Sequence, residues 1–155
     1  MDNLLSSTLE GIAKDSHLFY LLTNEELKRV AESLELEHFK AGDVLCREGD
    51  PGDFIAIISS GSVSVSKSTE FPGKNVILAK NGKGSFIGEL STVDENPRSA
   101  TVTAMEDTDA LILTRRALEE IINTAPEIGL KIYKGLIRIL GLKLRQSSAR
   151  IAQIF

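Results

Sequence analysis

The 155-residue sequence contains one cysteine, two histidines and no tryptophan. Because Cys46 has no second cysteine to pair with, a disulfide framework within one chain is excluded, and a reducing, cytoplasmic compartment is expected. His17 and His38 are too few and too far apart to supply the clustered ligands of a metalloenzyme. The longest apolar run, Phe54 to Ile58, is far shorter than a membrane span, and the first residues lack the basic and apolar regions of an export signal.

Acidic residues are missing from the C-terminal part of the chain, although the net charge is only −4. All 22 acidic residues lie at or before Glu127, and the basic residues after it are Lys131, Lys134, Arg138, Lys143, Arg145 and Arg150. A basic segment is compatible with a nucleic-acid partner. Cations spread along a helix more often form a solvated face, and we favour this interpretation.

The composition, with 42% apolar and 26% charged residues, is that of a soluble globular domain long enough to bury a core without disulfides or a structural metal. We expect helices over residues 1–34, a β-roll over 35–114 and helices over 115–155. In the first segment, apolar residues recur at helical spacing from Leu4 to Ile12 and again from Leu27 to Leu34. Thr23 and Glu26 predict a capping box at the start of the second helix.

Between Leu36 and Leu113 the pattern changes to short apolar runs separated by turn residues. The expected strands are 35–39, 44–46, 54–58, 62–66, 76–78, 100–102 and 110–113. Strands this short and frequent favour a small antiparallel barrel over βαβ units. The predicted fold class is therefore mainly β with flanking helices: an antiparallel β-roll, or jelly-roll-like double-stranded β-helix, with a long C-terminal helix.

Helical periodicity returns over residues 115–123 and again after Pro126, which suits the first turn of a helix. A heptad seam runs through the long helix, with a positions Leu130, Ile137, Leu144 and Ile151 and d positions Tyr133, Leu140, Ser147 and Ile154. This spacing predicts a parallel homodimer joined over residues 130–154. The alternative is that the helix packs on its own roll, because Leu136, Ile139 and Leu142 widen the apolar face.

The most informative segment runs from Gly84 to Val102 and contains Gly88, Glu89 and Arg98. A glycine lets a ligand approach the backbone closely, and a short turn can direct backbone N–H groups at an anion. A carboxylate accepts hydrogen bonds from hydroxyl groups, whereas a guanidinium binds phosphate oxygens in pairs. The segment therefore predicts a ligand that carries both a hydroxyl and a phosphate, such as a sugar phosphate.

This segment resembles the phosphate-binding cassette of cyclic nucleotide-binding domains, whose pattern is Phe-Gly-Glu-Leu, six residues, then Pro-Arg. Gly88, Glu89, Leu90, Pro97 and Arg98 match it in identity and spacing. The resemblance extends to residues 44–50 and 61–65 and to the flanking helices. It is strongest to catabolite-activator-type bacterial sensor domains, because residues 86–90 and 98–100 have the form of the motif that is found in those regulators.

The resemblance implies a cassette over residues 86–99. In it, Glu89 would bind the ribose 2′-hydroxyl and Arg98 the cyclic phosphate, with backbone N–H groups near Leu90 and Ser91 completing the phosphate site. Ser99 is a further candidate for a phosphate contact, with a neutral small residue entering a strand as the alternative.

The C-terminal helix supplies two weaker candidates. Ser147 and Ser148 resemble the Thr-Ser pair that meets the base in the regulator's dimer helix, although Ser147 could instead set the register of the seam. Thr92 departs from the family because its slot is usually aliphatic, and this change is expected to loosen the short cassette helix. The chain also stops about where the family's helix-turn-helix DNA-binding domain would begin, so we expect no DNA-binding domain in it.

The expected function is that of a non-catalytic sensor without a cofactor, which binds cyclic AMP, or alternatively cyclic GMP, and signals through the dimer helix to an unknown downstream protein. Two alternatives remain: an assembly module of the same fold without a ligand, and the sensor fragment of a DNA-binding transcription regulator. Cys46 is interpreted as a packing residue. Asp94 and Glu95 are interpreted as solvated carboxylates, so no catalytic set emerges.

Overall fold

A computed structural model describes residues 2–13 and 16–155. Its helices are α1 (Asp2–Ala13), α2 (Asn24–Ala31), α3 (Glu89–Asp94), α4 (Arg115–Thr124) and α5 (Pro126–Ile154). Its strands are β1 (Glu35–Phe39), β2 (Val44–Cys46), β3 (Phe54–Ser60), β4 (Val63–Ser68), β5 (Asn75–Asn81), β6 (Phe86–Ile87), β7 (Thr101–Ala104) and β8 (Thr108–Thr114). The mainly β class predicted from the sequence is confirmed, and β6 is a short strand that the sequence pattern did not reveal.

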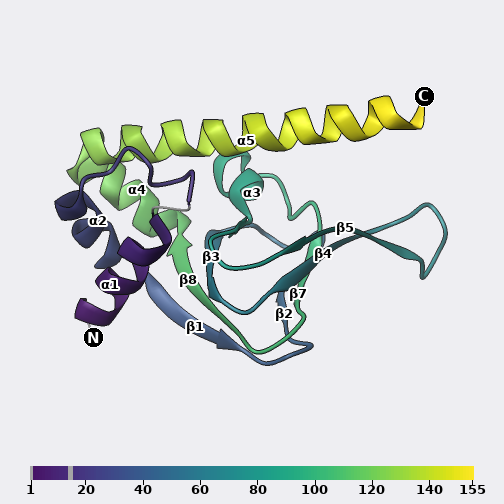
Figure 1. Ribbon diagram of the computed structural model, residues 1–155, viewed down its shortest axis with the longest axis horizontal. Coiled ribbons are helices and arrows are strands. Elements are labelled where there is room, and N and C mark those ends of the chain that lie inside the picture. The colour runs from purple at the N-terminus through teal and green to yellow at the C-terminus, as the bar shows by residue number, and fades with distance from the viewer. Residues whose placement is uncertain (1, 14–15) are drawn as a thin grey trace.

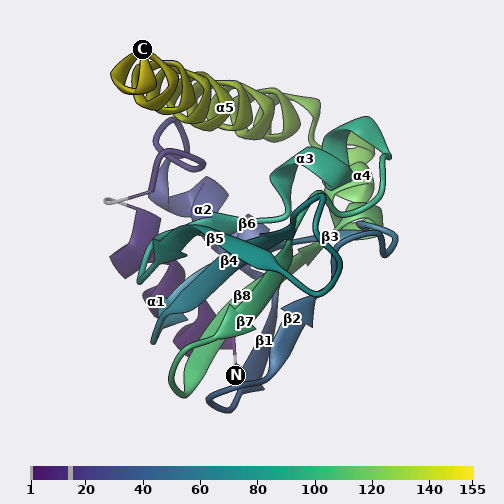
Figure 2. The same ribbon diagram turned by 90° about the vertical axis from the view of Figure 1, so that its right-hand side faces the viewer.

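The strands form two four-stranded antiparallel sheets, in the orders β1-β8-β3-β6 and β2-β7-β4-β5. Apolar side chains of both sheets meet inside the roll, including Ala56 and Ile58 of β3 and Val63 and Val102 of the second sheet. The roll therefore has its own small core, and Figure 2 shows its strands with the helices α1, α4 and α5 outside them.

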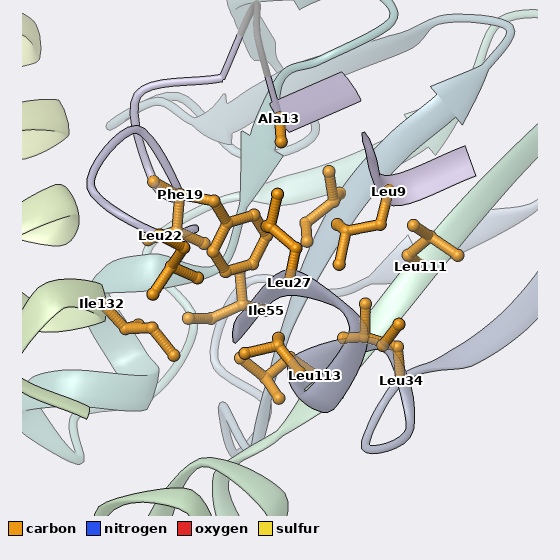
Figure 3. Close-up of a cluster of buried hydrophobic side chains, with 14 of the residues drawn as sticks. Leu9, Ala13, Phe19, Leu22, Leu27, Leu34, Ile55, Leu111, Leu113 and Ile132 are labelled. Atoms are coloured by element: carbon orange, nitrogen blue, oxygen red, sulfur yellow. The ribbon is translucent and has the colours of Figure 1, made fainter. Parts of the chain in front are cut away.

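A second, larger core lies outside the roll, where the first sheet is covered by the helices (Figure 3). Ile55 and Leu113 project from the sheet toward Leu9 of α1, Phe19 and Ile132 of α5. Because β3 and β8 are buried on both faces, their sequences are continuous apolar runs instead of alternating ones.

The helix caps agree with the local sequence. The capping box at α2 is confirmed: the Thr23 hydroxyl accepts from the Glu26 N–H, and the Glu26 carboxylate accepts from the Thr23 N–H. Thr114 caps α4 by accepting from the Ala117 N–H. Among the described helices, none combines the length and the apolar character needed to cross a membrane.

The long helix α5 runs past α4 and α3 and continues along the roll on the side of the β4–β5 hairpin (Figure 1), where Arg150 donates to Leu78 O of β5. Its first half packs on the rest of the chain through one face, formed by Ile128, Gly129, Ile132, Gly135, Leu136 and Ile139. The a positions of the predicted seam lie on another face and are exposed, from 57% for Leu130 to 69% for Leu144. The helix thus has one buried apolar face and a separate row of a positions, and packing on its own domain leaves these a positions exposed.

Most of the basic residues of α5 interact with the protein itself. Lys131 forms an ion pair with Glu26 at 2.9 Å, and Arg138 stacks on the Tyr20 ring at 4.6 Å. Two others, described below, turn toward the cavity of the roll. These contacts favour the interpretation of a partly engaged, solvated face over a nucleic-acid interface.

Candidate functional site

A cavity of about 380 Å³ lies between the second sheet, α3 and the C-terminal half of α5. Its wall combines apolar strand residues with four charged side chains, those of Glu89, Arg98, Lys143 and Arg150. Three of these are cationic and one is anionic, so the cavity suits an anion that also carries a hydrogen-bond donor.

Glu89 is the first residue of α3, and only 3% of it is exposed. Its carboxylate forms an ion pair with the Lys143 ammonium, which reaches across from α5. Burial of a carboxylate disfavours its charged form, and the lysine offsets this cost. Lys143 thereby orients the Glu89 carboxylate inside the cavity, and it ties the outer part of α5 to α3.

Arg98 lies at the base of the cavity and is also 3% exposed. Its backbone is fixed by the turn before β3, since the Arg98 N–H donates to Asp50 O at 2.7 Å and Arg98 O accepts from the Gly49 N–H at 2.8 Å. Its guanidinium donates to Gly88 O at 3.0 Å and Phe54 O at 2.8 Å and stacks on the Phe54 ring. The buried Nε–H has no partner among the described residues, which leaves donor capacity for a ligand.

Gly88 is the residue that lets Arg98 sit so close to α3. Its φ of +85° is in the left-handed region, which favours glycine. A Cβ at this position would overlap the Arg98 Nη1 atom and approach Phe54 O to 2.8 Å. A side chain here would therefore displace the guanidinium.

The first N–H groups of α3 have no intrahelical partner because the residues four positions before them lie outside the helix. Those of Leu90 and Ser91 belong to this group, and both residues line the cavity. Thr92 is buried, and its hydroxyl donates to Gly88 O at 2.9 Å. The Thr92 N–H donates to the same carbonyl at 3.4 Å, so the hydroxyl and the backbone share one acceptor. The expectation that Thr92 loosens α3 stays a prediction.

The structure brings most of the other candidate residues to the same cavity. Gly88, Ser99 and Ser147 line it together with Glu89 and Arg98. Both serines are exposed in the single chain, but Ser148 is not part of the cavity wall among the described residues. Of the two predicted base contacts, only Ser147 is thus positioned to meet a ligand.

Three residues of the cavity wall, Lys143, Gln146 and Arg150, were missed in the sequence. Together with Ser147 they follow a helical spacing of three and four along one face of α5. That spacing was visible in the sequence, but no local signal showed that this face turns toward the roll.

Cys46 also lines the cavity, from strand β2, and packs against the core of the roll. Burial raises the pKa of the Cys46 thiol above its usual value, and the nearby charge of Arg98 opposes this only in part. A protonated thiol is a poor nucleophile, which agrees with the interpretation of Cys46 as a packing residue.

The two carboxylates at the C-terminal end of α3 show no arrangement for acid–base chemistry. Asp94 accepts from the Asn96 N–H at 3.0 Å, and this bond is the main reason why the pKa of Asp94 is lowered. Glu95 follows it at φ 60°, as the C-cap of α3. In the described part of the chain, no cluster of three or more histidine, cysteine or acidic side chains could hold a metal ion.

Comparison with known protein families gives one match to this chain. A model described as the cyclic nucleotide-binding domain matches residues 36–125, which include all of the roll except its first residue, together with α4. The glycine, glutamate and arginine of the cavity all fall within the matched range.

Two curated proteins illustrate the range of relatives. The chain is 30% identical over 120 residues to cGMP-dependent protein kinase 2 of Mus musculus, covering 77% of this chain and 16% of the kinase. It is 27% identical over 146 residues to the CRP-like cAMP-activated global transcriptional regulator of Mycobacterium tuberculosis, covering 94% of this chain and 63% of the regulator. The chain thus spans less than two thirds of either relative.

Solved structures give the same picture at the level of the fold. A cyclic nucleotide-binding domain from Methylobacillus flagellatus aligns with a TM-score of 0.86 and 34% identity over 99% of this chain and 85% of that one. The catabolite activator protein of Thermus thermophilus aligns with a TM-score of 0.79 and 28% identity over 90% of this chain and 63% of that one.

Proposed function

Because this chain belongs to the cyclic nucleotide-binding domain family, we propose that it is a regulatory sensor that binds cyclic AMP in the cavity between the roll and α5. One observation carries the proposal: a buried carboxylate, Glu89, and a buried guanidinium, Arg98, line the same cavity of about 380 Å³. Burying two charged groups is costly unless partners compensate them. A ligand with a hydroxyl and a phosphate supplies such partners.

The bound ligand would lie with its sugar at α3. Its ribose 2′-hydroxyl donates to the Glu89 carboxylate, which keeps one oxygen for Lys143. Its cyclic phosphate accepts from Arg98 and from the N–H groups at the start of α3, with Ser99 nearby. The roles of Glu89 and Arg98 follow from the family's cassette, which residues 88–90 and 97–98 match.

Two features support adenine over guanine as the preferred base. The sequence Arg98-Ser99-Ala100 resembles that of bacterial cyclic-AMP regulators, and Ser147 of α5 lies in the cavity wall. Cyclic GMP is the alternative ligand. The signal leaves the domain through α5, whose exposed seam would join two copies, and reaches a downstream protein in the cytoplasm.

Thermal unfolding with added nucleotide tests the proposal directly. Cyclic AMP at 100 times its Kd should stabilise the protein by about 2.7 kcal/mol, which corresponds to a rise in Tm of roughly 5–10 °C for a domain of this size. Cyclic GMP should require a higher concentration for the same shift, and 5′-AMP serves as the control without a cyclic phosphate. An unchanged Tm with every cyclic nucleotide would favour the alternative of an assembly module without a ligand.

Ser147 and Ser148 provide a matched pair of variants for base recognition. Ser147→Ala should weaken cyclic AMP binding about threefold to tenfold, as expected for one lost hydrogen bond. Ser148→Ala should leave the affinity unchanged, because Ser148 lies outside the cavity wall of the described structure. Isothermal titration calorimetry measures both, and equal affinities for the two variants would remove Ser147 from the site.

A further inference from the structure

Arg115, the first residue of α4, connects three parts of the structure. Its Nη2 donates to Gly52 O in the turn before β3 at 2.6 Å and to Ser91 O in α3 at 2.7 Å. Its backbone N–H donates to Asp53 O at 2.7 Å. Hydrogen bonds from a charged donor are the stronger class, so this one side chain binds α3 to the turn and both of them to α4.

The position of Arg115 is unfavourable for α4 itself. The N-terminal end of a helix carries a partial positive charge, and the first turn of α4 contains no acidic residue to complement it. For α3 the same cation is favourable. It donates to Ser91 O, which also accepts from the Glu95 N–H at the C-terminal end of α3, and α3 has no basic residue in its last turn. The charge of Arg115 thus stabilises the C-terminal end of α3 and does not stabilise α4, the helix to which Arg115 belongs.

The segments around Arg115 are closely packed. A Cβ on Gly52 would overlap the Ser91 side chain, so the turn backbone lies directly against α3. On the other side, a Cβ on Gly129 of α5 would come within 2.8 Å of Ile122 in α4, so α4 and α5 are closely packed. A shift of α3 held by Arg115 is therefore passed to α4 and α5.

We infer that Arg115 is a positioning residue: it holds α3 in the geometry that binds phosphate and joins this helix to α4. The inference rests on the proposed function, because Ser91 belongs to the segment whose N–H groups would meet the cyclic phosphate. Arg115 does not line the cavity among the described residues, so it acts through α3 and not by touching the ligand.

The test compares Arg115→Met with Arg116→Met, the same substitution at the next residue, which is exposed. Hydrogen–deuterium exchange of the empty protein should be faster in α3 and in the turn at residues 49–53 of Arg115→Met, and unchanged in Arg116→Met. Cyclic AMP should bind about tenfold more weakly to Arg115→Met, within the range of known couplings between sites. In the wild type, cyclic AMP should slow exchange in the first turn of α4, and in Arg115→Met this protection should be lost.

Arg115→Lys completes the series, because a lysine keeps the charge and reaches one carbonyl but cannot bridge two in a plane. Its exchange and affinity should fall between those of the wild type and Arg115→Met. Wild-type exchange in α3 of Arg115→Met, or wild-type affinity, overturns the inference. If the wild type binds no cyclic nucleotide, the proposed function fails, and exchange of the empty variants alone still decides whether Arg115 holds α3.

Discussion

Replacing Arg98 by alanine is expected to lower the affinity for cyclic AMP by about 2–5 kcal/mol, roughly 30-fold to several thousand-fold. The substitution removes a buried cation from the cavity wall and leaves the phosphate charge without its expected partner. Isothermal titration calorimetry measures the loss. Unchanged affinity would remove Arg98 from the site.

The same substitution also affects folding, so binding must be measured on protein shown to be folded. Gly88 O and Phe54 O each lose a hydrogen bond from the guanidinium, although Gly88 O keeps the one from the Thr92 hydroxyl. A lost hydrogen bond from a charged donor costs about 1.5–3 kcal/mol. Arg98→Lys separates the two effects, because it keeps the charge but loses the paired geometry that fits phosphate oxygens. Arg145→Ala removes one cation from α5 outside the described cavity wall and should bind like the wild type.

The sequence predicted the type of each main element because local signals were strong. Thr23 and Glu26 marked the start of α2, and the turn residues separated the strands. The continuous apolar runs of β3 and β8 did not reveal which side chains face which core. Ile55 and Ile57 contact the helices whereas Ala56 and Ile58 fill the roll, and this division depends on tertiary packing.

The sequence predicted the site residues that lie within one short segment, but not those that come from distant parts of the chain. Glu89 and Arg98 lie in one segment, with the spacing of a known cassette. Lys143 is 54 residues beyond its partner Glu89, and nothing near either residue indicates the pairing. The direction of the Lys143 side chain is set by the face on which α5 packs, which only the folded structure defines.

The sequence alone also could not assign the apolar faces of α5. The sequence offered two alternatives, a dimer seam or packing on the roll, because apolar residues cover more of this helix than one interface needs. In the structure, the face that includes Leu136 and Ile139 is buried on the chain itself, whereas Leu144 and Ile151 on the seam are exposed. The two alternatives use different faces and are therefore compatible.

Replacing Leu144 by lysine is accordingly expected to dissociate the proposed dimer without unfolding the monomer. Leu144 is 69% exposed in the single chain, so a lysine there remains solvated in the monomer. In a parallel dimer the same position faces its own copy, and two ammonium groups would be buried together in the seam. The dimer dissociation constant should rise by at least about 30-fold, which corresponds to about 2 kcal/mol.

Sedimentation velocity at micromolar concentrations distinguishes the species, with Ala152→Lys as the control that adds the same charge to α5 outside the seam. That control should remain dimeric, and both variants should retain the wild-type Tm of the monomer. Cyclic AMP should still bind to Leu144→Lys, because Leu144 is not part of the described cavity wall, although the coupling of binding to dimer formation should be lost. If the wild type is monomeric at tens of micromolar with and without nucleotide, the exposed seam does not join two copies, and the signal must leave α5 through contact with a different protein.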